Sequence, residues 1–358
     1  MSRVLLLNQG YTHNLGDKLI NSVAREIIIS QGGEVIDHSF SDSVKYYKRI
    51  FSSNSSNSSN SSNSSNSSNS FKPVRILKFL LPRFIVFLLN NWRNFQEVWG
   101  YEFDSMVVGG GQLLRDNYNF SISLLIWVII SKLKKVPIYC VGVGIDEKFS
   151  WLNRIFLNLA LKGVNHVVAR DAKSIQYIKN TFGVNASLIN DFVFSISELK
   201  KNEPIKYEKK VLVVFPASYQ SVFKLYNNDV SYDSYLNSYV DIVKKSLFDK
   251  VVVVASDFSQ DKVVSEDLNS ILSTFVESHL KVIESESDFV NIIASAGQVV
   301  SGRMHPLIVA YSFGVTINPV LVNDKLSGFV SELTQNNISP EVVCSDYKKF
   351  FQTVLHNG

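Results

Sequence analysis

The sequence predicts an α/β protein made of two doubly wound, Rossmann-like parallel-sheet domains that face each other across a cleft. Its 358 residues exceed what one hydrophobic core usually organises, so two domains are expected. Short β-branched runs alternate with stretches of helical periodicity, which is the pattern of βα units on parallel sheets. The polar segment Glu198–Lys209, which contains Pro204, separates two such series. We therefore expect an N-terminal domain over residues 1–200 and a C-terminal domain over residues 201–358.

The β-branched runs define the expected strands. Those of the first half are Val4–Asn8, Glu34–His38, Ser105–Val108, Pro137–Val143 and Asn165–Ala169. Those of the second half are Lys210–Phe215, Lys250–Ala255, Leu280–Ile283, Gln298–Ser301 and Val315–Asn318. Two such domains around a cleft form the architecture of the GT-B glycosyltransferases, whose ligands gather at the carboxyl ends of the strands.

Composition and cysteine content indicate a globular protein of a reducing compartment. Hydrophobic residues make up 46% of the chain and charged residues 19%, which excludes a wholly disordered chain. Only Cys140 and Cys344 occur, so neither a disulfide framework nor a cysteine-based zinc site is expected. The apolar run Val4–Leu7 is too short for a signal peptide and is better interpreted as a first strand. A cytoplasmic location is therefore expected.

An insertion at about 42–98 accounts for the net positive charge of the chain. The net charge is +4, yet residues 45–95 hold eight basic side chains and no acidic one, which favours a local docking patch over a nucleic-acid-binding protein. Residues 52–70 repeat Ser-Ser-Asn and contain no side chain that could form a core, which predicts a surface loop. Their Asn-Ser-Ser triplets would be glycosylation acceptors only in a secreted protein. The adjoining apolar and basic run is broken by Pro82 and is too short to span a bilayer. We expect residues 72–93 either to contact an anionic membrane from the cytoplasmic side or to form helices that cover the N-terminal sheet.

Two motifs follow expected strands of the N-terminal half. Asn14-Leu15-Gly16-Asp17 stands between the first strand and a helical stripe, a place for an anion or a polar substrate, although Asn14 or Asp17 could simply cap the helix. Gly109-Gly110-Gly111 ends the third strand, where glycine lets the backbone approach a ligand. The pattern of a dinucleotide fingerprint fails at Leu114, and neither a Walker A sequence nor an Asp-x-Asp metal pair occurs.

Charged residues follow the next two apolar stretches. Arg170 comes directly after the fifth strand and suits a carboxylate or phosphate, while a structural pair with Asp171 is the alternative. Asp191 follows a later apolar stretch and could place a carboxylate in the cleft, but a turn or a helix cap is the simpler interpretation.

The sharpest constellation is Ser301-Gly302-Arg303-Met304-His305-Pro306, which leads from a buried strand into an apolar helix. Arg303 and His305 are two residues apart and share a face while the backbone stays extended. Pro306 then suits the first helical turn. A guanidinium beside an imidazole fits an anionic substrate that must receive a proton.

These motifs, in this order, resemble those of the polysaccharide pyruvyl transferase family, whose members act on capsule, exopolysaccharide and cell-wall polymers. The resemblance runs from residue 8 to about 330 and rests on the following matches: Asn14–Asp17, Gly109–Gly111, Ala169–Ser174, Ser301–His305, Ala310 and Phe313–Val315. It departs from the family at Gln112, where a fourth glycine is common.

The resemblance implies a GT-B-like fold and a transfer of pyruvate from phosphoenolpyruvate to a glycan sugar, or to its lipid-linked precursor, as a ketal. It implies no metal and no cofactor beyond this donor substrate. It places donor-binding arginines at Arg170 and Arg303, with His305 beside them. His305 would act as general acid toward the methylene carbon or as proton donor to the departing phosphate, and Asp17 or Asp191 would deprotonate the sugar hydroxyl.

The resemblance also implies substrate contacts beyond the charged groups. They involve Asn14, Ser301 and the three glycines Gly109, Gly110 and Gly111. Two competing hypotheses stay open. One is a GT-B glycosyltransferase that uses a nucleotide sugar, because the fold does not choose the chemistry. The other is a non-catalytic member of an envelope-assembly complex that binds through its basic segment.

Overall fold

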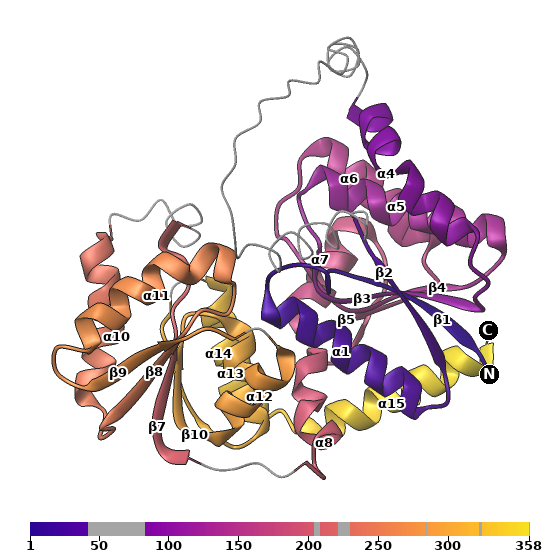
Figure 1. Ribbon diagram of the computed structural model, residues 1–358. Coiled ribbons are helices and arrows are strands. Elements are labelled where there is room, and N and C mark those ends of the chain that lie inside the picture. Colours follow the sequence, from indigo (N-terminus) through magenta and orange to yellow (C-terminus); the bar gives the residue numbers. More distant parts are fainter. Residues whose placement is uncertain (42–82, 204–207, 221–229, 284, 322–323, 358) are drawn as a thin grey trace, which may run out of the picture.

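The computed structural model describes residues 1–41, 83–203, 208–220, 230–283, 285–321 and 324–357. It contains two parallel β-sheets, each flanked by helices, in two halves of the chain (Figure 1). The two-domain parallel-sheet architecture expected from the sequence is therefore confirmed. The Ser-Ser-Asn repeat and the first part of the segment 72–93 lie outside the described residues.

The N-terminal sheet has the strand order β2-β1-β3-β4-β5-β6, and every neighbouring pair is parallel. Its strands are β1 (Arg3–Asn8), β2 (Glu34–Ser39), β3 (Ser105–Leu114), β4 (Ile138–Ile145), β5 (His166–Ala169) and β6 (Ser187–Leu188). Successive side chains of a strand point to opposite faces of its sheet. Val4 and Leu6 of β1 thus pack into one hydrophobic cluster, and Leu5 and Leu7 pack into another.

Different helices cover the two faces of this sheet. Helix α1 (Leu15–Ser30) packs in the cluster on one face. The other face is covered by α4 (Arg83–Trp99), α5 (Tyr118–Lys134), α6 (Trp151–Gly163) and α7 (Ala172–Phe182). Phe87, Phe95 and Val98 of α4 are buried in that second cluster. The described part of the segment 72–93 thus belongs to a helix that covers the N-terminal sheet.

The C-terminal sheet has the strand order β11-β10-β7-β8-β9 and is also parallel throughout. Its strands are β7 (Glu208–Phe215), β8 (Lys250–Val254), β9 (Glu277–Lys281), β10 (Ala296–Ser301) and β11 (Thr316–Pro319). Its helices are α10 (Tyr232–Lys245), α11 (Phe258–Leu272), α12 (Glu286–Ser295), α13 (Met304–Ser312) and α14 (Asp324–Asn336).

Three strands differ from the sequence prediction by more than two residues at one end or were not predicted at all. The strand expected over Leu280–Ile283 is β9 at Glu277–Lys281, because it is an edge strand of alternating polar and apolar residues and not an apolar run. The two-residue β6 is exposed and was not predicted. Strand β3 continues through the three glycines to Leu114, with a shift of register after Gly111. Gly110 and Gly111 adopt φ of 75° and 82°, a region that other residues rarely occupy.

Both sheets change winding direction at their middle. In the N-terminal sheet this topological switch point lies between β1 and β3, and in the C-terminal sheet between β7 and β10. In open α/β sheets the loops that follow such strands diverge and leave a crevice at the carboxyl ends. Two crevices of this kind, one from each domain, are available for a ligand.

The last helix of the chain returns to the N-terminal domain. After β6 the chain forms η1 (Phe192–Ser195) and α8 (Ile196–Leu199), and it ends in α15 (Pro340–Asn357), which lies beside α1 in Figure 1. The buried ring of Tyr347 stacks on Phe192 with 3.9 Å between ring centroids, and its hydroxyl donates to the carbonyl of Asn190 at 2.7 Å. The end of the expected 201–358 domain is thereby fastened to the other domain.

We expect Tyr347→Ala to lower the free energy of unfolding by about 3–5 kcal/mol, because it leaves a cavity against Phe192. Tyr347→Phe keeps the stacked ring and loses only the hydroxyl, so about 0.5–1.5 kcal/mol should be lost. Urea denaturation of both variants measures the two values. Equal losses would contradict the assigned stacking.

Candidate functional site

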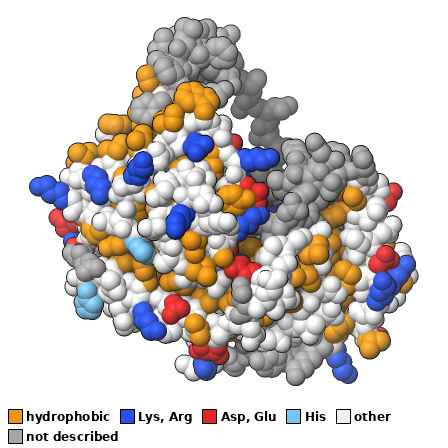
Figure 2. All heavy atoms as spheres, turned by 180° about the vertical axis from the view of Figure 1, so that it is seen from behind, with side chains coloured by type: hydrophobic (Ala, Val, Ile, Leu, Met, Phe, Trp, Pro, Cys, Tyr) orange, Lys and Arg blue, Asp and Glu red, His pale blue; other side chains and the backbone are white. Residues whose placement is uncertain are grey.

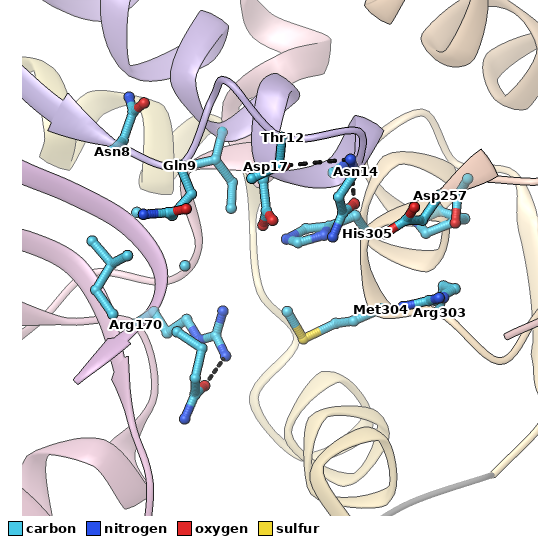
Figure 3. A pocket seen from close by; sticks show the side chains of 18 of the residues that line it. Asn8, Gln9, Thr12, Asn14, Asp17, Arg170, Asp257, Arg303, Met304 and His305 are labelled. Atoms are coloured by element: carbon cyan, nitrogen blue, oxygen red, sulfur yellow. Dashed lines mark hydrogen bonds between the residues drawn. The ribbon is translucent and has the colours of Figure 1, made fainter. Parts of the chain in front are cut away.

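A cavity of about 540 Å³ lies where the two switch points meet. The loops after β1 and β3 form one wall, and the start of α13 with the loop after β8 forms the other. Of the residues predicted from the sequence, the cavity is lined by Asn14, Asp17, Gly110, Gly111, Arg170, Arg303 and His305. Figure 3 shows Asn14, Asp17 and Arg170 of the N-terminal domain and Arg303 and His305 of the C-terminal domain around it.

The start of α1 forms a direct junction between the domains. Asn14 is the N-cap residue, and its side chain accepts from the backbone N–H of Gly16 at 2.9 Å, so the capping interpretation holds for Asn14. Asn14 also makes an antiparallel bridge with Asp257, which follows β8. The N–H of Leu15 donates to the carbonyl of Ser256 at 3.0 Å. The cap therefore orders one wall of the cavity and ties it to the other.

His305 lies against this junction. It occupies the first turn of α13, and its imidazole points into the cavity beside the carboxylate of Asp17 (Figure 3). A Cβ atom added to Gly16 would overlap Nδ1 of His305. The glycine of the Asn-Leu-Gly-Asp motif is thus required by close approach, and it brings the predicted acid and the predicted base together.

Arg303 is held by a fully buried carboxylate. Its guanidinium donates to Asp261, whose side chain also accepts from the N–H groups of Ser218 at 2.9 Å and Asp257 at 3.1 Å. Burial raises the pKa of Asp261, and the charge and hydrogen bond of Arg303 oppose this shift. The Nε atom of Arg303 has no hydrogen-bond partner among the described residues. The guanidinium is therefore oriented on one side and keeps donor capacity on another.

The backbone of Arg303 is fixed as well. Arg303 is extended, with φ of −108° and ψ of 142°, and it is the N-cap residue of α13. The expectation that the backbone stays extended as far as His305 is wrong, because the helix begins at Met304. The buried hydroxyl of Ser301 accepts from the N–H of Arg303 at 2.9 Å and donates to its carbonyl at the same distance. The Arg303 side chain makes no capping hydrogen bond to α13, and the first turn of this helix lines the cavity, where the positive end of its dipole favours an anion.

Arg170 is more enclosed than Arg303. Its side chain is 6% exposed, against 23% for Arg303. It donates to Gln112 at 2.7 Å and to Asp191 at 3.3 Å, while Asp171 lies 3.6 Å from its Nε. Both the predicted cavity position and the alternative structural pairing are thus observed. Arg170 supplies positive charge to the cavity and orients Gln112.

Three predicted site residues do not line this cavity. Gly109 lies within β3, and Ser301 lies beneath Arg303 and positions its backbone. Asp191 is buried and caps η1 by accepting from Val193, which agrees with the simpler interpretation of its sequence context. Asp191 instead lines a neighbouring cavity of about 500 Å³, which shares Arg170 and Gln112 with the first.

Sequence reasoning did not select Gln112, Asp146, Asp257 and Asp261. Gln112 was noted only as a departure from the family, yet it bridges Arg170 and Asp146 across the floor of the cavity. Asp257 follows β8 directly, so the rule that ligands gather at strand ends could have found it. Asp261 stands in the first turn of α11, and its ion pair with Arg303 is a tertiary contact. The local sequence therefore does not indicate that Asp261 belongs to the site.

Comparison with solved structures defines the class of fold. A putative UDP-N-acetylglucosamine 2-epimerase from Listeria monocytogenes has a TM-score of 0.56 at 9% identity, with 99% of this chain and 91% of that chain covered. The UDP-GlcNAc 2-epimerase of Methanocaldococcus jannaschii has a TM-score of 0.51 at 11% identity, with coverage of 98% and 93%. That of Neisseria meningitidis bound to UDP-GlcNAc has a TM-score of 0.50 at 10% identity and full coverage of both. The fold is GT-B-like, as predicted.

Sequence comparison identifies the family. The model of the polysaccharide pyruvyl transferase family matches residues 14–317, a range that begins at the cap of α1 and extends beyond His305. The chain belongs to the polysaccharide pyruvyl transferase family. Comparison with curated protein sequences gives no match.

We expect Gly16→Ala to lower the free energy of unfolding by about 1–3 kcal/mol, because the added methyl group overlaps His305. Replacing His305 by Ala in the same chain should relieve the overlap, so the double variant should be more stable than additivity of the single changes allows. Thermal unfolding of the four chains measures this coupling.

Gly328→Ala in α14 is a matched control, because a Cβ atom there meets nothing within 4 Å. It should leave stability unchanged or slightly higher. Additive effects of Gly16→Ala and His305→Ala on the stability would show that the methyl group at position 16 does not overlap the His305 ring in solution.

Proposed function

We propose that the chain transfers pyruvate from phosphoenolpyruvate to a sugar of a surface polysaccharide, or of its lipid-linked precursor, and forms a pyruvate ketal. The observation that carries this proposal is the convergence of Arg303, His305 and the start of α13 at the junction with Asp17, in a chain of the polysaccharide pyruvyl transferase family. Each of these groups has a task in such a transfer.

Arg303 and the start of α13 are suited to the donor anion. Phosphoenolpyruvate carries a carboxylate and a phosphate, and a guanidinium binds such groups through paired hydrogen bonds. Asp261 holds the guanidinium in one orientation before the donor arrives, so little side-chain entropy remains to be lost on binding. Backbone N–H groups at the start of a helix add a second site for an anionic oxygen. Arg170 contributes charge from the floor of the cavity.

The reaction requires two proton transfers. A proton added to the methylene carbon of phosphoenolpyruvate turns it into the methyl group and makes C2 electrophilic. One sugar hydroxyl then attacks C2, inorganic phosphate leaves, and a second hydroxyl closes the ketal. The two hydroxyl protons balance the proton taken up by carbon and the one taken up by phosphate. His305 is placed to donate to the carbon or to the phosphate oxygen.

Asp17 is the better of the two proposed general bases. It lines the cavity beside His305, whereas the carboxylate of Asp191 is occupied by the N–H of Val193 and by Arg170 outside the cavity wall. A base must come within hydrogen-bond reach of the hydroxyl that it deprotonates. We therefore assign this role to Asp17 and a structural role to Asp191.

The donor also fits the compartment that we propose. Phosphoenolpyruvate is consumed as a substrate, so the proposed reaction needs no further cofactor. Cys140 and Cys344 are buried free thiols, which suits a reducing cytoplasm.

Replacement of Arg303 and His305 tests the proposal. Arg303→Lys keeps the charge but loses the planar fork, so binding of phosphoenolpyruvate should weaken by about 1.5–3 kcal/mol. His305→Asn cannot deliver a proton, so turnover should fall by roughly 10²–10⁴ while donor affinity changes much less. Calorimetric titration of phosphoenolpyruvate and single-turnover kinetics separate the two effects.

Arg154→Lys on the surface of α6 is the matched control and should change neither quantity. A rise in melting temperature with UDP-sugars but not with phosphoenolpyruvate would favour a nucleotide-sugar transferase instead. Unchanged pyruvate on the glycan of cells that carry Arg303→Ala would favour a non-catalytic role. Near-normal turnover of His305→Asn would exclude its role as proton donor.

A further inference from the structure

The outer surface of α4, α5 and α6 combines exposed apolar side chains with basic ones. Among the side chains that the structure describes on these three helices, nine large apolar ones are exposed: Ile85, Leu89, Trp92, Trp99, Ile129, Leu133, Trp151, Ile155 and Leu159. In Figure 2 hydrophobic side chains and Lys and Arg side chains lie together over the upper part of the N-terminal domain. We call the outer surface of these helices the α4–α6 face.

The exposed apolar residues form stripes. On α4 they recur at Ile85, Leu89, Trp92 and Trp99, and on α6 at Trp151, Ile155 and Leu159. Spacings of three, four and seven residues place side chains on one side of a helix. The inner side of each helix is already buried against the sheet. Each helix is therefore apolar on two opposite sides, which a helix of a water-exposed surface does not need.

The three helices lie side by side in one layer. Helix α4 connects β2 to β3, α5 connects β3 to β4, and α6 connects β4 to β5. Each connection moves in the same direction across the sheet. Because such connections are right-handed, the three helices lie on the same face. Phe95 of α4 packs edge-on against Trp127 of α5 at 5.1 Å, and Tyr118 of α5 packs against Phe156 of α6 at 5.8 Å. The stripes thus belong to one rigid surface.

The charge of this surface is almost entirely positive. The only acidic residue in the sequence of the three helices is Glu97, whose carboxylate accepts from the hydroxyl of Tyr101 at 2.8 Å. Exposed basic residues stand next to the apolar stripes: Arg93, Lys132, Arg154 and Lys162, with Lys135 directly after α5. None of these five forms an ion pair with another residue that the structure describes.

The face reaches the mouth of the cavity. Arg115 and Phe120, at the start of α5, line the cavity, and the guanidinium of Arg115 lies 5.6 Å from the centroid of the Phe120 ring. Asp116 accepts from the N–H of Ser150 at 3.0 Å, which joins the starts of α5 and α6. Trp151, 73% exposed, follows at once. A surface on which α5 and α6 rest would therefore adjoin the opening of the site.

We propose that the α4–α6 face docks on the surface of an anionic lipid bilayer and holds the cavity mouth next to it, so that a lipid-linked acceptor reaches the site from the membrane. The statement about the acceptor rests on the proposed function, whereas docking does not. Docking extends the contact expected from residues 72–93 to a three-helix surface that continues beyond them. No described helix is long and apolar enough to cross a bilayer, which is consistent with a helix layer that rests in the interface.

The chemistry of the face favours lipid over a protein partner. Tryptophan is enriched where one part of a side chain is apolar and the other is wet, as at the level of lipid headgroups, and three tryptophans are exposed here. Basic side chains without acidic partners gain about 1 kcal/mol each near an anionic membrane. A protein partner or a second copy of this chain would have to supply a matching acidic surface, which makes both of them outcomes of the test.

Vesicle flotation of the full chain tests docking without donor or acceptor. The chain should float with vesicles of phosphatidylcholine and phosphatidylglycerol at low salt, and not with phosphatidylcholine alone. The variant Trp92→Ser, Trp151→Ser, Arg154→Glu, Lys162→Glu should bind the anionic vesicles at least about tenfold more weakly. All four side chains are exposed, so the melting temperature should stay within a few degrees of the parent chain and establishes that the variant folds.

A matched variant alters the C-terminal domain instead, with Leu247→Ser, Phe275→Ser and Lys245→Glu, which are also exposed. It should bind vesicles within about twofold of the parent chain, because it leaves the α4–α6 face unchanged. Failure of the parent chain to bind anionic vesicles, or equal loss in both variants, would overturn the proposal. A dimer that only the α4–α6 variant abolishes would assign the face to a second copy.

A second measurement separates docking from the proposed activity. The α4–α6 variant should transfer pyruvate to a short soluble sugar acceptor as fast as the parent chain, because none of its changes lies in the cavity. It should lose at least about tenfold in rate with a lipid-linked acceptor embedded in anionic vesicles. Failure of transfer in the parent chain would disprove the proposed function and leave the vesicle-binding result intact.

Discussion

The buried carboxylate of Asp261 is the interaction on which the geometry of the site depends. A fully buried charge is costly unless it is paired and fully hydrogen-bonded, and Asp261 meets this demand with Arg303 and two backbone N–H groups. Those partners come from three loops, which follow β7, β8 and β10. Because Asp257 of the second loop also bridges to Asn14, the same network extends across the domain boundary. Loss of the carboxylate would remove the acceptor that the guanidinium and both N–H groups share.

The two arginines of the cavity differ in how much of their hydrogen-bonding capacity the protein itself uses. Each has a carboxylate partner, so a count of charges does not tell them apart. Their hydrogen bonds do tell them apart. Arg170 donates to Gln112 and Asp191 at the cavity floor, whereas the Nε of Arg303 has no partner among the described residues. Preorganisation of this kind fixes a donor group before the anion arrives and thereby lowers the entropy lost on binding.

Much of this arrangement could be predicted from the sequence, and the exceptions share a physical cause. Arg303 and His305 follow a buried β-branched strand and precede an apolar helix, so local pattern alone places them at a strand end. Asp261 and Gln112 act through tertiary partners, and an acid in the first turn of a helix looks like an ordinary cap-region charge. Ser301 was expected to touch the substrate, but its hydroxyl is used by the backbone of Arg303. The local sequence indicates where a residue lies in the fold. It does not indicate with which partners the polar atoms of that residue form hydrogen bonds.

The two faces of the N-terminal sheet are covered by different helices, and only one of these helix layers shares a hydrophobic cluster with the C-terminal domain. On one face α1, η1 and α15 share a single hydrophobic cluster with the C-terminal domain, so that face holds the two halves of the cleft together. The layer of α4 to α7 buries its inner side in a second, separate cluster that contains no residue of the C-terminal domain. Because the hydrophobic cluster that joins the domains lies on the first face, the outer side of α4 to α6 belongs to neither described core. Apolar side chains at helical spacing on this outer side add nothing to the described cores, and this is the observation from which we propose that the face docks on another surface.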